Sequence, residues 1–88
     1  MAIKDISHPP VIYRVLREDE RILVNAWDEI SVVGVRVTVH DEQRKLLESG
    51  EAVQFQKDWW EYTPTAVGKV SACAWDLPGN KVHIDLEE

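Results

Sequence analysis

The segment at residues 67–86 constrains the fold of this chain more than any other stretch. It reads VGKVSACAWDLPGNKVHIDL, with two runs of alternating apolar residues on either side of Leu77-Pro78-Gly79-Asn80. Proline at the second position of a turn presets φ at about −65°, and glycine at the third accepts the positive φ of a type II turn. The segment therefore predicts a β-hairpin.

Alternating apolar residues predict three further strands, at residues 11–17, 21–27 and 32–39. In the last of these, the valines at odd positions share one face, and Gly34, Arg36, Thr38 and His40 share the other. Residues 21–27 also fit a helix, because Leu23, Ala26, Trp27 and Ile30 recur at helical spacing. The Ile-Leu-Val cluster in this segment favours the strand.

The run at residues 41–49, DEQRKLLES, predicts one short helix. Asp41 can cap the first turn, good helix formers follow, and Gly50 can close the last turn in the left-handed conformation. A helix this short requires tertiary contacts, which Leu46 and Leu47 would supply.

Residues 51–57 predict a further strand that buries Val53 and Phe55. The aromatic run that follows, at residues 58–65, ends near Pro64, which cannot donate a backbone hydrogen bond to a sheet. We therefore expect residues 58–65 to form an irregular connection.

Together these elements predict one domain, residues 1–88, with a lead-in at residues 1–10. The predicted class is α+β and mainly antiparallel β, with two hairpins and a short helix at about residues 41–49. The order of features from Gly50 to Leu86 resembles that of SH3-like small barrels: a strand after a Gly-Glu turn, an aromatic loop, a strand opened by Gly68, a tight turn and a closing strand. The resemblance covers less than half of the chain, and it implies a barrel-like sheet in the C-terminal half without implying a function.

The tripeptide Ala-Trp-Asp occurs twice, at residues 26–28 and 74–76. Chance is one explanation. The other is that both halves of the chain use the same hairpin, with Trp27 and Trp75 at equivalent strand ends.

A chain of 88 residues buries only about 60–65% of the surface that its unfolded form exposes, so a few large side chains should carry much of the core. The candidates are the four tryptophans, Trp27, Trp59, Trp60 and Trp75. The net charge of −6 disfavours direct binding to nucleic acid phosphates, because that affinity depends on Lys and Arg.

No apolar stretch is long enough to span a bilayer, and residues 1–10 lack a signal-peptide pattern, so we expect a cytoplasmic protein without membrane contact. Cys73 is the single cysteine, which excludes an internal disulfide and a metal site built on several thiolates. Nothing in the sequence calls for a cofactor.

Motifs for dinucleotide or phosphate binding, for zinc proteolysis and for a nucleophile elbow are absent from the sequence. Of the three histidines, His83 would share a strand face with Asp85, and His40 precedes Asp41. Solvated polar-face residues explain both pairs, and Cys73 has no basic residue closer in sequence than Lys69. We predict neither a catalytic nor a metal site, and an enzyme using His83 and Asp85 is the least favoured hypothesis.

The segment at residues 58–62 carries more aromatic surface than a loop requires. In an extended segment adjacent side chains point to opposite faces, so one of Trp59 and Trp60 should enter the core and the other should reach the surface. Exposed aromatic residues beside charges are typical of protein interfaces. The predicted partner-binding residues are Trp59, Trp60, Tyr62, Asp58 and Glu61.

The leading hypothesis is therefore a non-catalytic protein-interaction module, such as an accessory subunit, regulator or inhibitor. One alternative is a small barrel that binds a small ligand at a mouth lined by the same aromatic residues. A further alternative is a homo-oligomeric structural protein, assembled through an edge strand or the aromatic patch. If both rings simply cover the open end of the sheet, this segment is no binding site.

Overall fold

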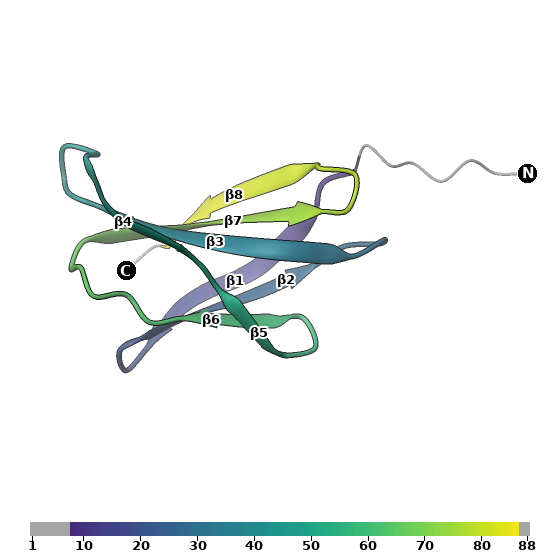
Figure 1. The fold of residues 1–88 in the computed structure, drawn as a ribbon, viewed down its shortest axis with the longest axis horizontal. Helices are drawn as coiled ribbons and strands as arrows, with labels where there is room; N and C mark the ends of the chain where they lie inside the picture. Colours follow the sequence, from purple (N-terminus) through teal and green to yellow (C-terminus); the bar gives the residue numbers. More distant parts are fainter. Residues whose placement is uncertain (1–7, 87–88) are drawn as a thin grey trace, which may run out of the picture.

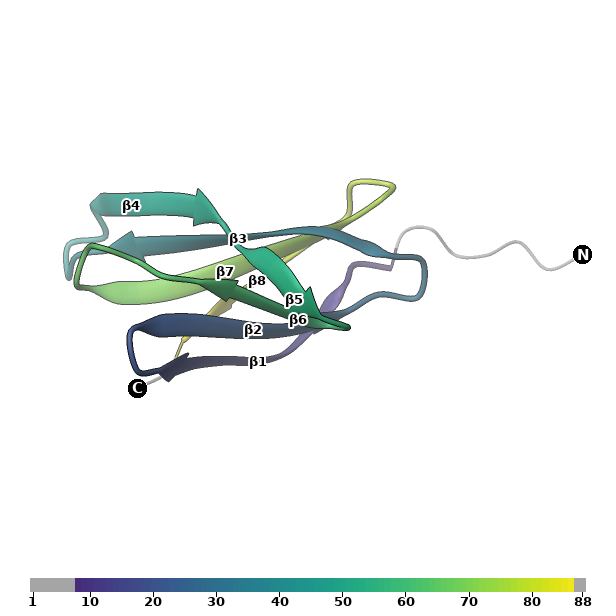
Figure 2. The same cartoon turned by 60° about the horizontal axis from the view of Figure 1, so that its bottom comes forward.

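A computed structural model describes residues 8–86, which form two packed four-stranded antiparallel sheets (Figures 1 and 2). Sheet A has the strand order β1-β2-β6-β5, and sheet B has the order β4-β3-β7-β8. The strands are β1 (Val11–Glu18), β2 (Arg21–Trp27), β3 (Val32–His40), β4 (Leu46–Glu51), β5 (Val53–Gln56), β6 (Trp59–Tyr62), β7 (Lys69–Asp76) and β8 (Lys81–Asp85). The prediction of a mainly antiparallel β fold is confirmed.

The three strands predicted from alternation are present as β1, β2 and β3. In β3 the valines at positions 35, 37 and 39 are fully buried. Val33 is exposed, because the pairing of β3 with β7 shifts register between Val32 and Gly34 and ends the alternation there.

The predicted C-terminal hairpin is also present, as β7 and β8. Gly79 has a φ of 99°, the positive value that its place in the turn requires. The Gly79 amide donates to the Asp76 carbonyl at 3.0 Å, so the turn spans residues 76–79 and begins one residue earlier than the sequence suggests. A turn followed by a glycine with positive φ is the usual form of a three-residue hairpin loop.

The helix predicted at residues 41–49 is wrong, because this segment forms a tight turn and then strand β4. Oδ1 of Asp41 accepts hydrogen bonds from the amides of Gln43 and Lys45, both at 2.9 Å, and closes a turn instead of capping a helix. The chain then pairs along the free edge of β3. Gly50 serves close packing, since a Cβ there would lie 2.5 Å from Cε1 of Tyr62.

The chain passes from sheet B to sheet A between β4 and β5 (Figure 2). At this crossing the Ala52 amide donates to the Val35 carbonyl at 2.8 Å. The two sheets do not close into a barrel, so the expectation drawn from SH3-like proteins is wrong. Val53 and Phe55, predicted to be buried, are 65% and 43% exposed, because β5 is an edge strand.

The irregular connection predicted at residues 58–65 is also wrong in part. Residues 59–62 form β6, which is an interior strand between β2 and β5. Pro64 lies beyond the end of β6, where it removes no hydrogen bond from the sheet.

The core between the sheets consists mainly of valine, isoleucine and alanine side chains from β2, β3 and β7. Of the four tryptophans only Trp60 is buried, at 5% exposure, and the other three lie at least partly at the surface. Residues 1–7 of the predicted lead-in lie outside the described residues, and Pro10 at its end is fully buried. Among residues 8–86 no helix is present that could cross a membrane.

Candidate functional site

The predicted partner-binding residues are divided between two faces of sheet A by the alternation of β6. Trp60 is part of the core cluster, and Tyr62 packs against it from the same face. Trp59 and Glu61 therefore point to the outer face, as the sequence predicts for two consecutive tryptophans. Asp58, with a φ of 66°, occupies the turn between β5 and β6.

Tyr62 helps to fix the connection that follows β6. Its hydroxyl donates to Oε2 of Glu48 at 2.5 Å, while Oε1 of Glu48 accepts from the amides of Thr65 and Ala66 at 2.8 and 2.7 Å. The hydrogen bond from Tyr62, followed by the one from Ala66, lowers the pKa of Glu48 to about 2. The Glu48 carboxylate therefore joins β4 to the segment leaving β6, which is a structural role.

On the outer face of sheet A, Trp59 lies in an open groove of about 500 Å³. We define the Trp59 groove by the apolar side chains of Leu16, Leu23, Phe55 and Trp59, which come from β1, β2, β5 and β6 in turn. Leu23 is buried although it points away from the core, whereas Phe55 is exposed. An apolar surface of this kind on an outer sheet face is a typical contact surface for another protein.

The polar rim of the Trp59 groove carries both signs of charge, with Arg14, Arg21 and Glu18 beside Gln56. Nη1 of Arg21 donates to Oε2 of Glu61 at 2.6 Å, and Nη2 contacts Oε1 of Glu18 at 3.2 Å. The hydrogen bond to Glu61 raises the pKa of Arg21, so this cation is already partnered. Arg14 is exposed and forms no ion pair with any residue in the range 8–86.

Leu16, Leu23 and Phe55 are not among the binding residues that the sequence predicts. A signal was present in Ile22-Leu23-Val24, because three consecutive apolar residues in a strand require apolar surroundings on both faces. Phe55 was placed in the core because its strand could not be recognised as an edge.

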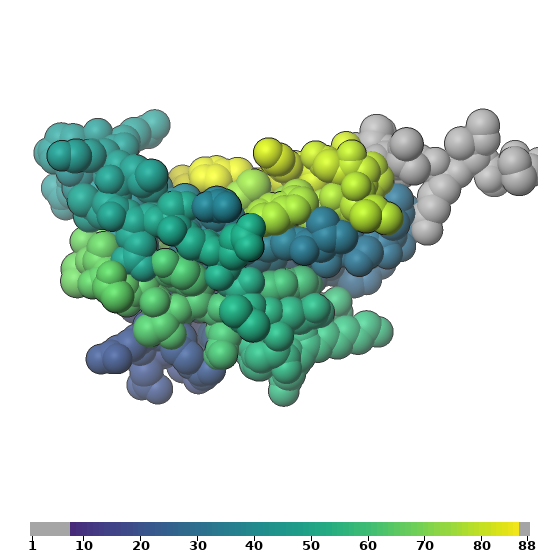
Figure 3. All heavy atoms as spheres, viewed as in Figure 1, coloured from purple at the N-terminus to yellow at the C-terminus, as the bar shows by residue number. Residues whose placement is uncertain are grey.

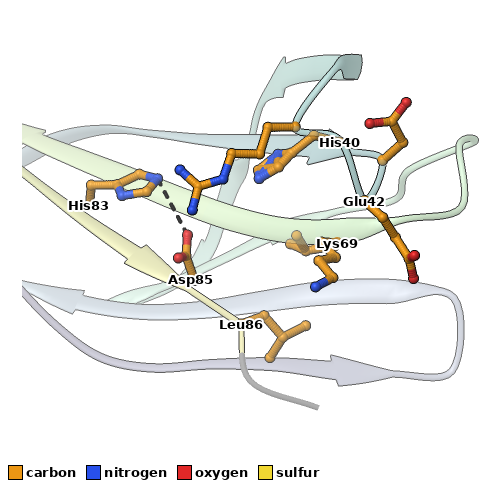
Figure 4. A pocket seen from close by; sticks show the side chains of 9 residues that line it. His40, Glu42, Lys69, His83, Asp85 and Leu86 are labelled. Carbon is orange, nitrogen blue, oxygen red and sulfur yellow. Dashed lines mark ion pairs between the residues drawn. The ribbon is translucent and has the colours of Figure 1, made fainter.

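A second concave site lies at one end of the outer face of sheet B (Figure 4). It encloses about 410 Å³, and its polar lining consists of His40, Asp41, Glu42, Arg44, Lys69, His83 and Asp85. Nε2 of His83 lies 3.7 Å from Oδ1 of Asp85, and both side chains are well exposed. Within residues 8–86 no group of three or more His, Cys, Asp and Glu side chains could hold a metal ion.

Cys73 is partly buried on the same outer face, near the middle of β7. Its register partners are Arg36 on β3 and His83 on β8. Along the chain the nearest basic residue is Lys69, whereas pairing across the sheet brings Arg36 and His83 beside Cys73.

Comparisons with protein-family models, with curated proteins and with solved structures gave no match for this chain.

Proposed function

We propose that this chain is a non-catalytic protein-interaction module that binds its partner through the Trp59 groove. The observation that carries the proposal is the apolar floor of the groove, open to solvent and built from four strands on the outer face of sheet A. The indole of Trp59 and the ring of Phe55 offer large contact area at little cost in side-chain entropy. Trp60 and Tyr62 contribute from the inner face by holding β6 in place.

The charge on the rim indicates the chemistry of the partner. The chain carries a net charge of −6, yet the groove is bordered by Arg14 and Arg21. Because Arg21 is paired with Glu61 and Glu18, Arg14 is the cation left to attract a carboxylate. We therefore infer a polypeptide segment with apolar side chains for the groove and an acidic residue beside them.

The test is affinity capture from a native extract with the wild-type chain and three variants. We expect Trp59→Ala and Arg14→Glu to lose the same captured protein, whereas Trp27→Ala should retain it. Trp27 is a matched control, because it is an exposed tryptophan on a different part of the surface. Equal recovery by Trp59→Ala and wild type would contradict the proposal, and loss with Trp27→Ala would place the contact elsewhere.

A small-ligand-binding protein is the second candidate function, and the pocket in Figure 4 favours it. Its lining carries both signs of charge, with Arg44 and Lys69 beside Asp41, Glu42 and Asp85, so it would suit a small ligand that bears an anionic and a cationic group. A thermal-shift screen with free amino acids checks this candidate. A rise in Tm that Lys69→Ala abolishes and Trp59→Ala preserves would favour it over the Trp59 groove.

A further inference from the structure

Strand β8 forms one of the two free edges of sheet B, with no described strand beyond it (Figure 1). In the space-filling view the yellow atoms of the β7–β8 hairpin lie along the upper rim of the molecule (Figure 3). A free edge exposes a row of backbone donors and acceptors, and natural proteins usually interrupt such an edge.

Three of the four sheet edges are interrupted by an irregularity in their pairing. The register shifts between Ile12 and Arg14 on β1, between Val39 and His40 opposite β4, and between Gln54 and Gln56 on β5. The pairing of β8 with β7 has no such shift over its whole length. Of the described edges, β8 is thus the regular one, which another strand can extend.

The hydrogen-bonding phase of β8 identifies its free backbone groups. The Leu86 amide donates to the Val70 carbonyl, and the Asp76 amide donates to the Asn80 carbonyl. Because bonded pairs alternate in an antiparallel ladder, residues 82, 84 and 86 direct their backbone groups at β7. Lys81, His83 and Asp85 therefore direct theirs away from the sheet.

The sequence of β8, Lys81-Val82-His83-Ile84-Asp85, has opposite charges symmetrically placed about His83. Antiparallel pairing of two copies with His83 opposite His83 satisfies the hydrogen-bonding phase along the whole strand. It places Lys81 of each copy opposite Asp85 of the other, which gives two cross-strand ion pairs. A shift of two residues toward the hairpin turn would instead leave Lys81 opposite His83.

We propose that two copies of this chain form an antiparallel dimer through β8, in the register that pairs His83 with His83. The two sheets B then join into one eight-stranded sheet around a two-fold axis. Ile84, which is 38% exposed although it lies on the inner face of β8, gains a neighbour in Val82 of the second copy. This dimer is independent of the Trp59 groove, which lies on the other sheet.

Sedimentation of the full chain over a range of concentrations tests the dimer. We expect wild type to reach twice the mass of the monomer, and Lys81→Glu and Asp85→Lys each to weaken dimerisation about tenfold or more, because each change creates two like-charge pairs. Lys57→Glu, the same charge change in the β5–β6 turn, should leave the dissociation constant unchanged. A wild-type chain that stays monomeric up to about 1 mM, the weak end of specific association, overturns the proposal.

Mixing the Lys81→Glu variant with the Asp85→Lys variant tests the register. In the mixed dimer the carboxylate introduced at position 81 of one chain faces the ammonium group introduced at position 85 of the other. The native Asp85 of the first chain then faces the native Lys81 of the second, so the mixture should dimerise where each variant alone does not. Failure of the mixture to form a heterodimer would rule out this register.

His83→Pro tests the edge itself, because proline removes an amide that points away from β7 and so spares the fold. We expect a monomer with an unchanged circular dichroism spectrum. A dimer that survives His83→Pro, or one that Trp59→Ala abolishes, would overturn the proposal.

Discussion

The tripeptide Ala-Trp-Asp ends one strand in each sheet, and the two copies begin alike. Ala26 and Ala74 are both fully buried between the sheets. Each aspartate then accepts backbone amides of the turn that follows: Oδ1 of Asp28 accepts from Ile30 at 2.7 Å, and Oδ1 of Asp76 accepts from Asn80 at 2.7 Å. The repeated sequence therefore encodes a buried strand end with a carboxylate-stabilised turn.

The two copies differ in what comes next. Asp76 closes the β7–β8 hairpin, whereas Asp28 precedes a crossing from sheet A to sheet B, and β2 and β3 do not pair. The idea that both halves use the same hairpin is wrong for the first copy. A short motif can thus specify how a strand ends without specifying which strand follows it in space.

The largest difference between the copies should appear when each aspartate is removed. Asp76 is 1% exposed, and its carboxylate accepts from two amides and from the Asn80 side chain. Asp76→Ala removes the acceptor of the Asn80 amide and one of the two acceptors of the Gly79 amide, and it leaves a buried position unfilled, so we expect Tm to fall by about 10 °C. Asp28→Ala should lower Tm by about half as much, because Asp28 is partly solvated and its hydrogen bonds are with the amides of Ile30 and Ser31.

Thermal unfolding followed by circular dichroism measures both variants against wild type. Equal losses would mean that the two copies are energetically equivalent, and the comparison would fail.

The alternation of apolar and polar residues was sufficient to predict the strands that bury one face and expose the other to solvent. This holds for the valines of β3 and for the alternation that separates Trp59 from Trp60. It fails at residues 41–49, where helix propensity opposed the pairing of β4 with β3. Helix propensity contributes little free energy per residue, and the pairing of β4 with the edge of β3 outweighs it.

The candidate site was harder to predict than the fold, because it is assembled from four strands whose order the sequence does not state. Trp59 could be identified from its alternation with Trp60. Leu16 and Phe55 join the groove only because β1 and β5 lie in the same sheet as β6. The symmetric charges of β8 can be seen in the sequence, but they suggest pairing with a second copy only because β8 is an edge strand.

The stability that Asp76 contributes should depend on pH more strongly than that of an ordinary turn carboxylate. Burial raises the pKa of Asp76, but the hydrogen bonds from the Asn80 side chain and amide outweigh burial, so the pKa lies below its usual value of 3.8. A carboxyl group with a lowered pKa in the folded state stabilises the fold fully above the unfolded pKa, and this stabilisation is lost as pH falls through the folded pKa. Stability should therefore fall as pH drops below 3.8.

Urea unfolding at pH 5 and pH 3 checks this dependence. Asp76→Asn keeps an acceptor in the turn but cannot titrate, so its urea midpoint should change less between the two values than that of wild type. Glu48→Gln gives a parallel case over a wider window, since the pKa of Glu48 falls from 4.5 to about 2 on folding. An Asp76→Asn midpoint that falls as steeply as that of wild type would show that Asp76 is not the group responsible.

The smallest expected difference concerns the two tryptophans. A Cβ on Gly34 would lie 2.1 Å from Cζ2 of Trp75, so the indole of Trp75 covers this glycine on the outer face of sheet B. Gly34→Leu should displace the indole and cost about 1–2 kcal/mol of unfolding free energy, because the packing of this partly exposed ring against β3 is lost. Trp27, which is 43% exposed, covers no glycine in the described chain, and Trp27→Ala should cost less than about 1 kcal/mol. Chemical denaturation of both variants measures the free energy of unfolding. If Trp27→Ala lowers this free energy as much as Gly34→Leu or more, the packing of Trp75 on Gly34 contributes no additional stability.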